Sequence, residues 1–212
     1  LMNRGGRFEA RPLPAMAQWA PAHGVAVADF DGDGREDLFL AQNLFPTEIG
    51  TPRLEAGVGL LLLGDGVGVF RPLALRESGI VIRGDQRGVA VADFDGDGRP
   101  DLAVAQNAGP TVLLKNVTGR PGLRVRLAGP DAGNPSAIGA QMRLEGAGWS
   151  GPVRSVTLGG GYWSSGSFTG VLSDVRPPRA VWVRWPSGRE ERYPVSGDAR
   201  EVVLRPSAAP RP

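Results

Sequence analysis

Residues 25–43 read VAVADFDGDGREDLFLAQN, and residues 89–107 read VAVADFDGDGRPDLAVAQN. The two stretches are identical at 16 of 19 positions, and they lie 64 residues apart. Near-identity at one fixed offset indicates an internal repeat, in which each copy builds the same small unit of structure. This repeat decides how the first half of the chain folds.

The residues on either side of the acidic centre have the patterns of β-strands. In residues 25–30, two valines and Asp29 alternate with two alanines and Phe30, so the two sets are expected on opposite faces of one strand. Residues 38–41 and 102–105 are short apolar runs, as a buried strand shows. Weaker echoes of a strand that enters a glycine turn occur at residues 1–8, 62–70 and 112–116.

Each unit is therefore predicted to hold four short strands, which suits a β-propeller blade. Because a single blade cannot bury both of its faces, neighbouring units must stack on each other. The composition agrees with an all-β protein: glycine (32) and proline (19) supply about a quarter of the 212 residues, with strand-like runs between them. We interpret them as turn residues rather than as a sign of disorder.

Each copy contains a nine-residue acidic loop, at residues 29–37 and 93–101. Aspartates occupy positions 1, 3, 5 and 9, and an arginine at position 7 would offer its backbone carbonyl. Glycine at position 6 permits the sharp, positive-φ turn that lets the chain wrap an ion. The predicted metal ligands are Asp29, Asp31, Asp33, Arg35 and Asp37 in the first loop, and Asp93, Asp95, Asp97, Arg99 and Asp101 in the second.

The predicted ion is Ca²⁺, at two sites. Calcium takes six to eight oxygen ligands at about 2.3–2.6 Å, whereas magnesium demands a rigid octahedron and retains its waters. Zinc would recruit His or Cys, and neither loop has one. The helix–loop–helix calcium hand needs a glutamate at position 12, where Leu40 and Val104 stand. A plain acidic surface turn is the competing hypothesis, and a purely structural ion is favoured over a signalling or catalytic one.

Several classes of site are excluded or disfavoured by composition. The absence of cysteine excludes disulfides, thiol catalysis and zinc–thiolate sites. No apolar stretch approaches the roughly 20 residues that cross a bilayer. Residues 1–118 carry 11 basic and 15 acidic residues, and residues 119–212 carry 13 and 7. The arginines are scattered rather than clustered, which disfavours nucleic-acid binding.

A different texture begins after residue 118. We therefore divide the chain into a repeat region at residues 1–118, a second β domain at residues 119–206 and a disordered tail at residues 207–212. The second domain is expected to be a small sandwich or curled sheet. Its strands are expected at residues 123–127, 141–144, 153–158, 180–185 and 201–204, and its turns at residues 129–131, 159–161 and 185–188.

These segments resemble known families. The loops, with VAVADF before them and DL after them, resemble FG-GAP/VCBS repeats, the calcium-loop blades of integrin-α-type β-propellers. The second half resembles the ASPIC/UnbV domain, and the order of the two is similar to that in cartilage acidic protein. The segments that carry the second resemblance are GLRVRL at 122–127, AIGAQMRL at 137–144, GGGY at 159–162 and VWVRWPSG at 181–188.

The resemblance implies a partial propeller of about two blades, followed by a small β-sandwich-like domain. Propellers usually close with four to eight blades, so further blades are expected from an N-terminal part of a longer protein. The resemblance also implies a secreted, cell-surface or periplasmic location. One segment departs from the family, because SFTGVL at residues 167–172 stands where Phe-Gly-Leu-Gly is common.

The implied function is that of a calcium-stabilised module for adhesion, or for binding a protein or glycan partner, without catalysis. Two other hypotheses stay open: an accessory or catalytic part of a polysaccharide-acting enzyme, and a scaffold with no ligand beyond calcium. For a polysaccharide-acting enzyme, the candidate catalytic carboxylates are Glu145, Glu190 and Glu191, although none lies in a recognisable motif.

Two further sites are weighed on their residues. Tyr162 and Trp163 follow three glycines and could stack on a sugar ring. A flexible turn with core aromatics is the simpler hypothesis for them, and we place it first. His23 is the one histidine, and without a nucleophile elbow nearby it is expected to be a surface or turn residue. At least one of Trp182 and Trp185 is expected in the core.

Overall fold

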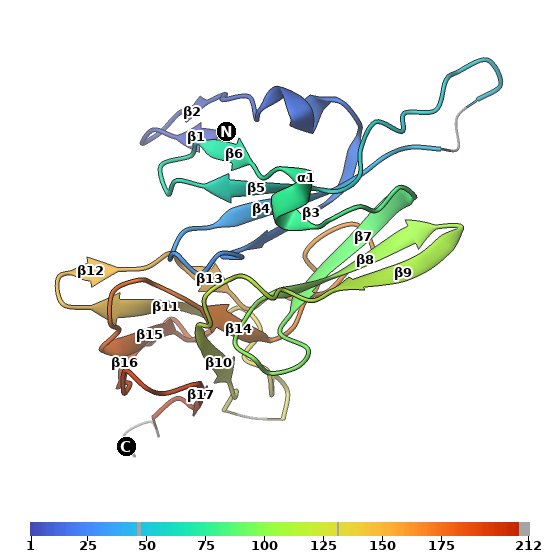
Figure 1. Ribbon diagram of the computed structural model, residues 1–212. Helices are drawn as coiled ribbons and strands as arrows, with labels where there is room; N and C mark the ends of the chain where they lie inside the picture. The colour runs from blue at the N-terminus through green and yellow to red at the C-terminus, as the bar shows by residue number, and fades with distance from the viewer. Residues whose placement is uncertain (46–47, 131, 208–212) are drawn as a thin grey trace.

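The computed structural model describes residues 1–45, 48–130 and 132–207. The architecture is all-β, with several antiparallel sheets (Figure 1). The helical elements in these residues are short: a 3-10 turn, η1 (Ala15–Gln18), and a one-turn helix, α1 (Leu75–Ser78). Among the described helices, none has the length and apolar character needed to span a membrane.

The first repeat unit forms a four-stranded antiparallel sheet in the order in which the strands occur along the chain. The predicted count of four strands is confirmed for this unit, which we call blade 1. The buried run predicted at residues 38–41 is also largely confirmed, since Phe39, Leu40 and Ala41 are each at most 2% exposed. The strands of blade 1 are β3 (Ala22–Ala28), β4 (Asp37–Gln42), β5 (Leu60–Gly64) and β6 (Phe70–Pro72).

The second unit, blade 2, has three strands, so the prediction of four is wrong here among the described residues. The chain that follows its last strand does not turn back. Instead it runs across the acidic loops and bonds to them, as described below. The strands of blade 2 are β7 (Asp85–Ala92), β8 (Asp101–Asn107) and β9 (Gly109–Leu114). The run at residues 102–105 is only partly buried, because Ala105 is exposed on this more open sheet.

The core between the blades explains the alternation in β3. Ala26, Ala28 and Phe30 are buried, whereas Val25 is 44% exposed and Val27 53% exposed, as the pattern predicts. The buried face of β3 packs toward β7, and side chains from both blades share one apolar cluster. Each blade thus covers the apolar face of the other blade.

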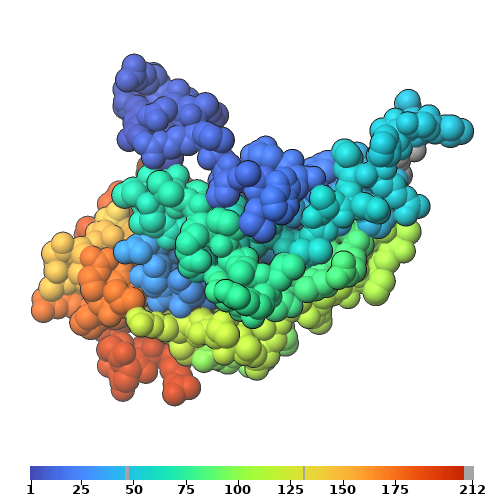
Figure 2. Space-filling model, turned by 45° about the horizontal axis from the view of Figure 1, so that its top comes forward, coloured from blue at the N-terminus to red at the C-terminus, as the bar shows by residue number. Residues whose placement is uncertain are grey.

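A separate hairpin precedes blade 1. It consists of β1 (Met2–Asn3) and β2 (Phe8–Glu9), joined by a glycine turn as the echo at residues 1–8 predicts. The same arrangement recurs in β5 and β6, where Phe70 packs against an apolar cluster. In the first hairpin Phe8 is 70% exposed, and the hairpin projects from the body of the molecule (Figure 2). The hairpin therefore repeats the strand–turn–strand arrangement of β5 and β6 without the apolar packing of Phe70.

The C-terminal domain consists of two sheets that enclose one core (Figure 1). One sheet has the order β14-β10-β17, with β10 (Leu123–Leu127), β14 (Thr169–Leu172) and β17 (Glu201–Leu204). The other has β11 (Gln141–Gly146) at its centre, with β15 (Ala180–Arg184) on one side and β16 (Glu190–Pro194) beyond it. Two short strands also pair with β11, namely β12 (Trp149–Ser150) and β13 (Arg154–Ser155).

The expected sandwich is thus present, and four of its five predicted strands lie where the sequence places them. The fifth, at residues 153–158, shrinks to β13. The strands β12, β14 and β16 are missed, because each is short or polar on alternate positions. Both Trp182 and Trp185 are buried. Within the predicted turn and tail, Asp131 and residues 208–212 lie outside the described residues.

Candidate metal centres

The first acidic loop, loop 1 (residues 29–37), connects β3 to β4. One carboxylate oxygen from each of Asp29, Asp31 and Asp37 lies within 4.8 Å of the others. Asp29 is 2% exposed and Asp37 is 1% exposed. Three convergent carboxylates form the hard oxygen donor set that calcium prefers.

Backbone N–H groups fix these carboxylates. Asp37 accepts hydrogen bonds of 2.8 Å from the N–H of Phe30 and of 2.8 Å from that of Gly64, the last residue of β5. Gly34 has a φ of 91°, which confirms the positive-φ turn predicted at position 6. Asp29 accepts three further bonds of 2.8–3.0 Å, from the N–H groups of Gly32, Asp33 and Gly34.

Burial controls the charge of loop 1. It raises the pKa of Asp29 to about 6 and that of Asp37 to about 7, although the backbone N–H donors oppose the shift. Without a metal, these carboxyls therefore take up protons as the pH falls through about 7 for Asp37 and about 6 for Asp29. Among the described residues, no cationic side chain forms an ion pair with Asp29, Asp31 or Asp37. A bound divalent cation would supply the missing positive charge.

The second loop, loop 2 (residues 93–101), connects β7 to β8 with the same geometry. Oxygens of Asp93, Asp95 and Asp101 lie within 4.8 Å of one another. Asp101 accepts from the N–H of Phe94 at 3.1 Å and from that of Asn116 at 2.7 Å. Asp93 accepts bonds of 2.8–3.1 Å from Gly96, Asp97 and Gly98. The two loops are thus copies in structure as well as in sequence.

Comparisons with known families match these elements. A family model for the FG-GAP repeat matches residues 87–120, which contain loop 2. A second family model, for ASPIC and UnbV, matches residues 130–210. The chain carries an FG-GAP repeat followed by an ASPIC/UnbV domain. No curated protein matches the chain. Loop 1 lies outside the matched FG-GAP residues, although it shares the sequence pattern and the triad geometry of loop 2.

The environment of the loop in the matched FG-GAP repeat is more cationic than that of loop 1. The ammonium of Lys115 contacts the carboxylate of Asp95 and lies 3.6 Å from that of Asp97. The Nη1 atom of Arg124 is 3.4 Å from Asp93. The hydrogen bond from Lys115 lowers the pKa of Asp95, whereas burial raises the pKa of Asp101. The carboxylates of loop 2 are therefore partly neutralised by two neighbouring basic side chains, Lys115 and Arg124.

The predicted ligands at positions 5 and 7 lie outside both triads. Asp33 and Asp97 each accept a hydrogen bond from the arginine two residues later, through its backbone N–H and its guanidinium. The side chain of Arg99 also donates to the carbonyl of Gly119 at 2.6 Å. These arginines therefore fasten the loops through their side chains, which the sequence analysis does not predict. The use of Asp33, Asp97 and the Arg35 and Arg99 carbonyls as ligands stays a prediction.

Both loops face the linker to the ASPIC/UnbV domain. Asn116 donates its side-chain N–H to the carbonyl of Phe30 at 2.7 Å, which joins the end of blade 2 to loop 1. The N–H of Arg120 donates to the carbonyl of Asp31 at 3.0 Å, and that of Gly122 donates to the carbonyl of Gly98 at 2.8 Å. A metal ion in either loop would therefore stiffen the junction between the repeat region and the ASPIC/UnbV domain.

Side chains from the ASPIC/UnbV domain also reach the loops. Arg154 forms a bidentate ion pair with Glu36 at 2.9 Å in both contacts. The carboxylate of Asp174 lies against Gly34, where a Cβ would come within 2.7 Å of its oxygen. Sequence reasoning misses Lys115, Arg124, Arg154 and Asp174. An alignment of the strand echoes at residues 62–70 and 112–116 matches Lys115 with an apolar residue, Leu63, and so marks the lysine as unusual.

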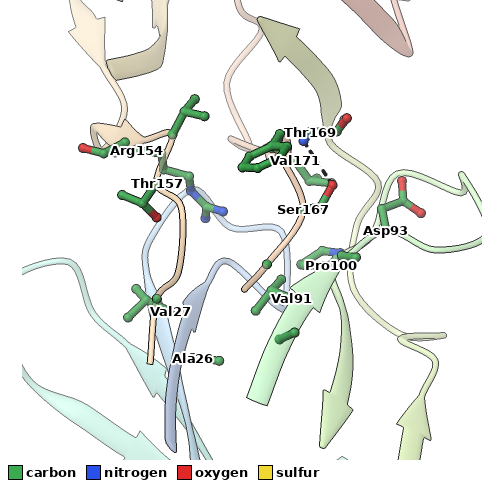
Figure 3. Close-up of a pocket in the computed structure, with 18 of the residues that line it drawn as sticks. Ala26, Val27, Val91, Asp93, Pro100, Arg154, Thr157, Ser167, Thr169 and Val171 are labelled. Carbon is green, nitrogen blue, oxygen red and sulfur yellow. Dashed lines mark hydrogen bonds between the residues drawn. The ribbon is translucent and has the colours of Figure 1, made fainter. Parts of the chain in front are cut away.

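A cavity of about 390 Å³ lies between the blades and the ASPIC/UnbV domain (Figure 3). Val27 of β3 and Val91 of β7 line one side, and Arg154, Thr157 and Val171 line the other. The backbone N–H of Ser167 donates to the carbonyl of Val91 at 2.9 Å, which joins the two sides of the cavity. The walls combine apolar side chains with hydroxyl side chains, and the charged groups among the lining residues are the Arg154–Glu36 pair and Asp93 of loop 2.

The aromatic residues predicted as a ligand site are not part of the core. Trp163 is 92% exposed and Tyr162 is 49% exposed, so the simpler hypothesis of core aromatics is wrong. Trp163 has a φ of 48°, a strained conformation for a bulky residue. The Tyr162 ring meets His23 edge-on at 6.4 Å, and His23 in turn contacts Arg87 at 2.7 Å. His23 is thus a half-buried strand residue rather than a turn residue.

The candidate catalytic glutamates are engaged in ion pairs and hydrogen bonds. Burial by itself would raise the pKa of Glu145, but hydrogen bonds from Arg143 and Arg192 outweigh it and lower the pKa. Burial would also raise the pKa of Glu191, but hydrogen bonds from Tyr193, Ser207 and Trp185 lower it to about 2. Glu190 accepts from the indole of Trp182 at 3.2 Å. A general acid in sugar hydrolysis needs a raised pKa, which is the opposite shift.

Proposed function

We propose that this chain is a calcium-stabilised binding module that acts outside the cytoplasm, with calcium in a mainly structural role. The observation that carries the proposal is the pair of acidic triads at equivalent positions in two stacked blades. In loop 1, two buried carboxyls with raised pKa values have no cationic partner among the described residues. Calcium would satisfy them and join blade, linker and domain.

The test is thermal unfolding of the chain in EDTA, in about 2 mM calcium and in about 2 mM magnesium. At 100 times Kd, a ligand stabilises the folded state by about 2.7 kcal/mol. For a protein of this size, we expect a rise in Tm of roughly 5–10 °C with calcium. Magnesium should give much less, because it dehydrates reluctantly. Equal Tm values in EDTA and calcium would reject the proposal.

A double variant, Asp31→Asn with Asp95→Asn, is the matched control. Each substitution keeps the size of the side chain and removes one charge from the middle of a triad. Its Tm in EDTA should stay close to that of the wild type, while the calcium-dependent rise should shrink strongly. A rise of the same size in the double variant would mean that calcium acts elsewhere on the protein.

For the partner, we propose a glycan or protein surface that contacts the loop at residues 159–166. The exposure of Trp163 supports this, because an exposed indole costs apolar hydration unless a partner covers it. The test is a glycan and matrix-protein array at millimolar calcium with wild type and Trp163→Ala. Binding that is lost in the variant supports the proposal. No binding by the wild type favours the scaffold hypothesis.

Catalysis on polysaccharide is the weaker candidate. The lowered pKa values of Glu145 and Glu191 argue against a general acid at either residue. A location in the periplasm, on the cell surface or in the medium is part of the proposal and is supported by the resemblance and by the calcium-type loops. Fractionation of cells that express the full-length protein tests it directly, and a purely cytoplasmic signal would contradict it.

A further inference from the structure

One residue outside each loop differs between the two blades, and in blade 2 its side chain reaches the triad. In blade 1, Leu38 pairs with Leu62, and in blade 2, Leu102 pairs with Leu114. The equivalence continues two residues later, where the N–H of Gly64 donates to Asp37 at 2.8 Å and the N–H of Asn116 donates to Asp101 at 2.7 Å. The residue between these landmarks is Leu63 in blade 1 and Lys115 in blade 2.

Lys115 is the one lysine of the chain. Its ammonium contacts Asp95, a member of the loop 2 triad, and lies 3.6 Å from Asp97. Leu63, at the equivalent place, carries no charge toward loop 1. The contrast is therefore between a triad with a tethered cation and a triad without one.

We propose that Lys115 is a built-in competitor for calcium at loop 2, so that loop 1 fills first and loop 2 fills at higher calcium. This inference rests on the proposed calcium function and deepens it. It assigns to Lys115 the role of setting the affinity of one site relative to the other.

The physical basis is the way in which each loop tolerates its own acidity without metal. Four carboxylates on nine residues repel one another unless something neutralises them. In loop 1, Asp29 and Asp37 are buried, and among the described residues no cationic side chain forms an ion pair with a member of the triad. In loop 2, the ammonium of Lys115 contacts Asp95 and neutralises part of the acidic charge. Calcium must displace this side chain from loop 2, whereas no tethered ammonium opposes calcium at loop 1.

The displacement at loop 2 is feasible because Lys115 is at the surface. Its side chain is 47% exposed, so the ammonium can swing into water when a divalent ion arrives. An ammonium that stayed beside the carboxylates would repel the ion. Exposed ion pairs are weak, so the expected penalty on calcium affinity is about three- to fivefold.

Isothermal titration of the full chain with calcium tests this, using two exchanged variants. Lys115→Met should raise the affinity of the weaker site about three- to fivefold and leave the stronger one unchanged. Leu63→Lys should lower the affinity of the stronger site by a similar factor. Arg184→Met, which removes a charge from an exposed position on β15, is the control and should change neither site. Unchanged affinities in Lys115→Met with two sites intact would overturn the inference.

A second readout follows Lys115 itself. Reductive methylation with ¹³C-formaldehyde keeps the positive charge and labels this side chain and the terminal amine, because the chain has no other lysine. The midpoint of the Lys115 methyl shift should lie at a free calcium concentration about three- to fivefold above the Kd of the stronger site. A midpoint at or below that Kd, or no shift while both sites fill, would contradict the proposed order. Failure of the wild type to bind calcium would overturn the proposed function as well.

Discussion

Loop 1 and loop 2 share 16 of the 19 residues in and around them, yet their surroundings differ. Loop 1 joins two strands of a four-stranded blade, and among the described residues no cationic side chain forms an ion pair with its triad. Loop 2 joins two strands of a three-stranded blade and is flanked by Lys115 and Arg124. The comparison shows that the repeat fixes which carboxylates converge, while residues outside the repeat set their charge.

One of the three differences within the repeat has a structural consequence. Position 8 is Glu36 in loop 1 and Pro100 in loop 2. Glu36 holds the guanidinium of Arg154 in a bidentate pair, which ties loop 1 to the ASPIC/UnbV domain. Loop 2 is tied to the same domain by Arg124, through Asp93 itself. The domain therefore contacts loop 1 at a residue next to the triad, Glu36, and loop 2 at a member of the triad, Asp93.

The largest expected effect separates Asp37→Ala from Asp101→Ala in calcium. Asp37→Ala removes a triad carboxylate and leaves the N–H groups of Phe30 and Gly64 without their buried acceptor. Lost calcium binding and unsatisfied donors together should lower the free energy of unfolding by about 3–5 kcal/mol. Asp101→Ala should have a smaller effect, because Lys115 already neutralises part of loop 2 and less calcium stabilisation is lost there. Urea unfolding at saturating calcium measures both, and equal losses would remove the distinction between the loops.

The next effect is a pH dependence that belongs mainly to loop 1. The pKa values of Asp29 and Asp37 are raised from 3.8 to about 6 and about 7 in the folded state. Between about pH 4 and pH 7, the metal-free folded protein therefore binds more protons than the unfolded chain, and the free energy of unfolding must fall as pH rises. The stabilisation that comes from protonated Asp29 and Asp37 is fully present below about pH 4 and is lost as the pH rises through about 6 and 7.

Unfolding midpoints in EDTA, taken from pH 4.5 to pH 8, test the sign. Asp37→Asn should flatten the slope, because the amide does not titrate, and Asp95→Asn should leave it almost intact. In saturating calcium the wild-type slope should reverse or vanish, since the ion replaces the protons. A metal-free protein that gains stability up to pH 7 would show that loop 1 is not protonated.

The sequence predicts much of the fold and of the candidate site, for local reasons. The strand alternation at Val25–Ala28, the turn glycines and the convergence of aspartates at positions 1, 3 and 9 all follow from spacing along one segment. What the sequence does not reveal depends on contacts between distant segments. The partners Arg154 and Glu36 lie 118 residues apart, and Asn116 bonds to a carbonyl 86 residues away. No periodicity encodes such contacts.

The exposure of Trp163 and the missing fourth strand of blade 2 could not be predicted from the sequence, for related reasons. An aromatic beside glycines is equally compatible with a core turn and with an exposed loop, and only the packing of residues 159–166 over β7 distinguishes them. The fourth strand is absent from the described part of blade 2 because Asn116 and Gly119 form hydrogen bonds with each other, and Asn116 also with loop 1. These competing bonds turn the chain toward the ASPIC/UnbV domain before another strand can form.

The smallest expected effect concerns position 7. The Arg35 side chain is 54% exposed, and its ion pair among the described residues is with Asp33, so Arg35→Ala should change the free energy of unfolding by less than about 0.5 kcal/mol. Arg99 is 25% exposed and also donates to the carbonyl of Gly119 at 2.6 Å. Arg99→Ala should cost about 1 kcal/mol, because that carbonyl loses a charged donor.

Chemical denaturation of the two variants in calcium resolves a difference of this size, with Arg→Lys at each position as the partner variant. Lysine keeps the charge but not the planar fork, so Arg99→Lys should restore only part of the lost stability, whereas Arg35→Lys should match the wild type. If both alanine variants were neutral, the side chain at position 7 would be irrelevant in both loops. The two arginines would then serve through their carbonyls alone, and loop 2 would be fastened to the linker by the Gly122–Gly98 backbone bond rather than by Arg99.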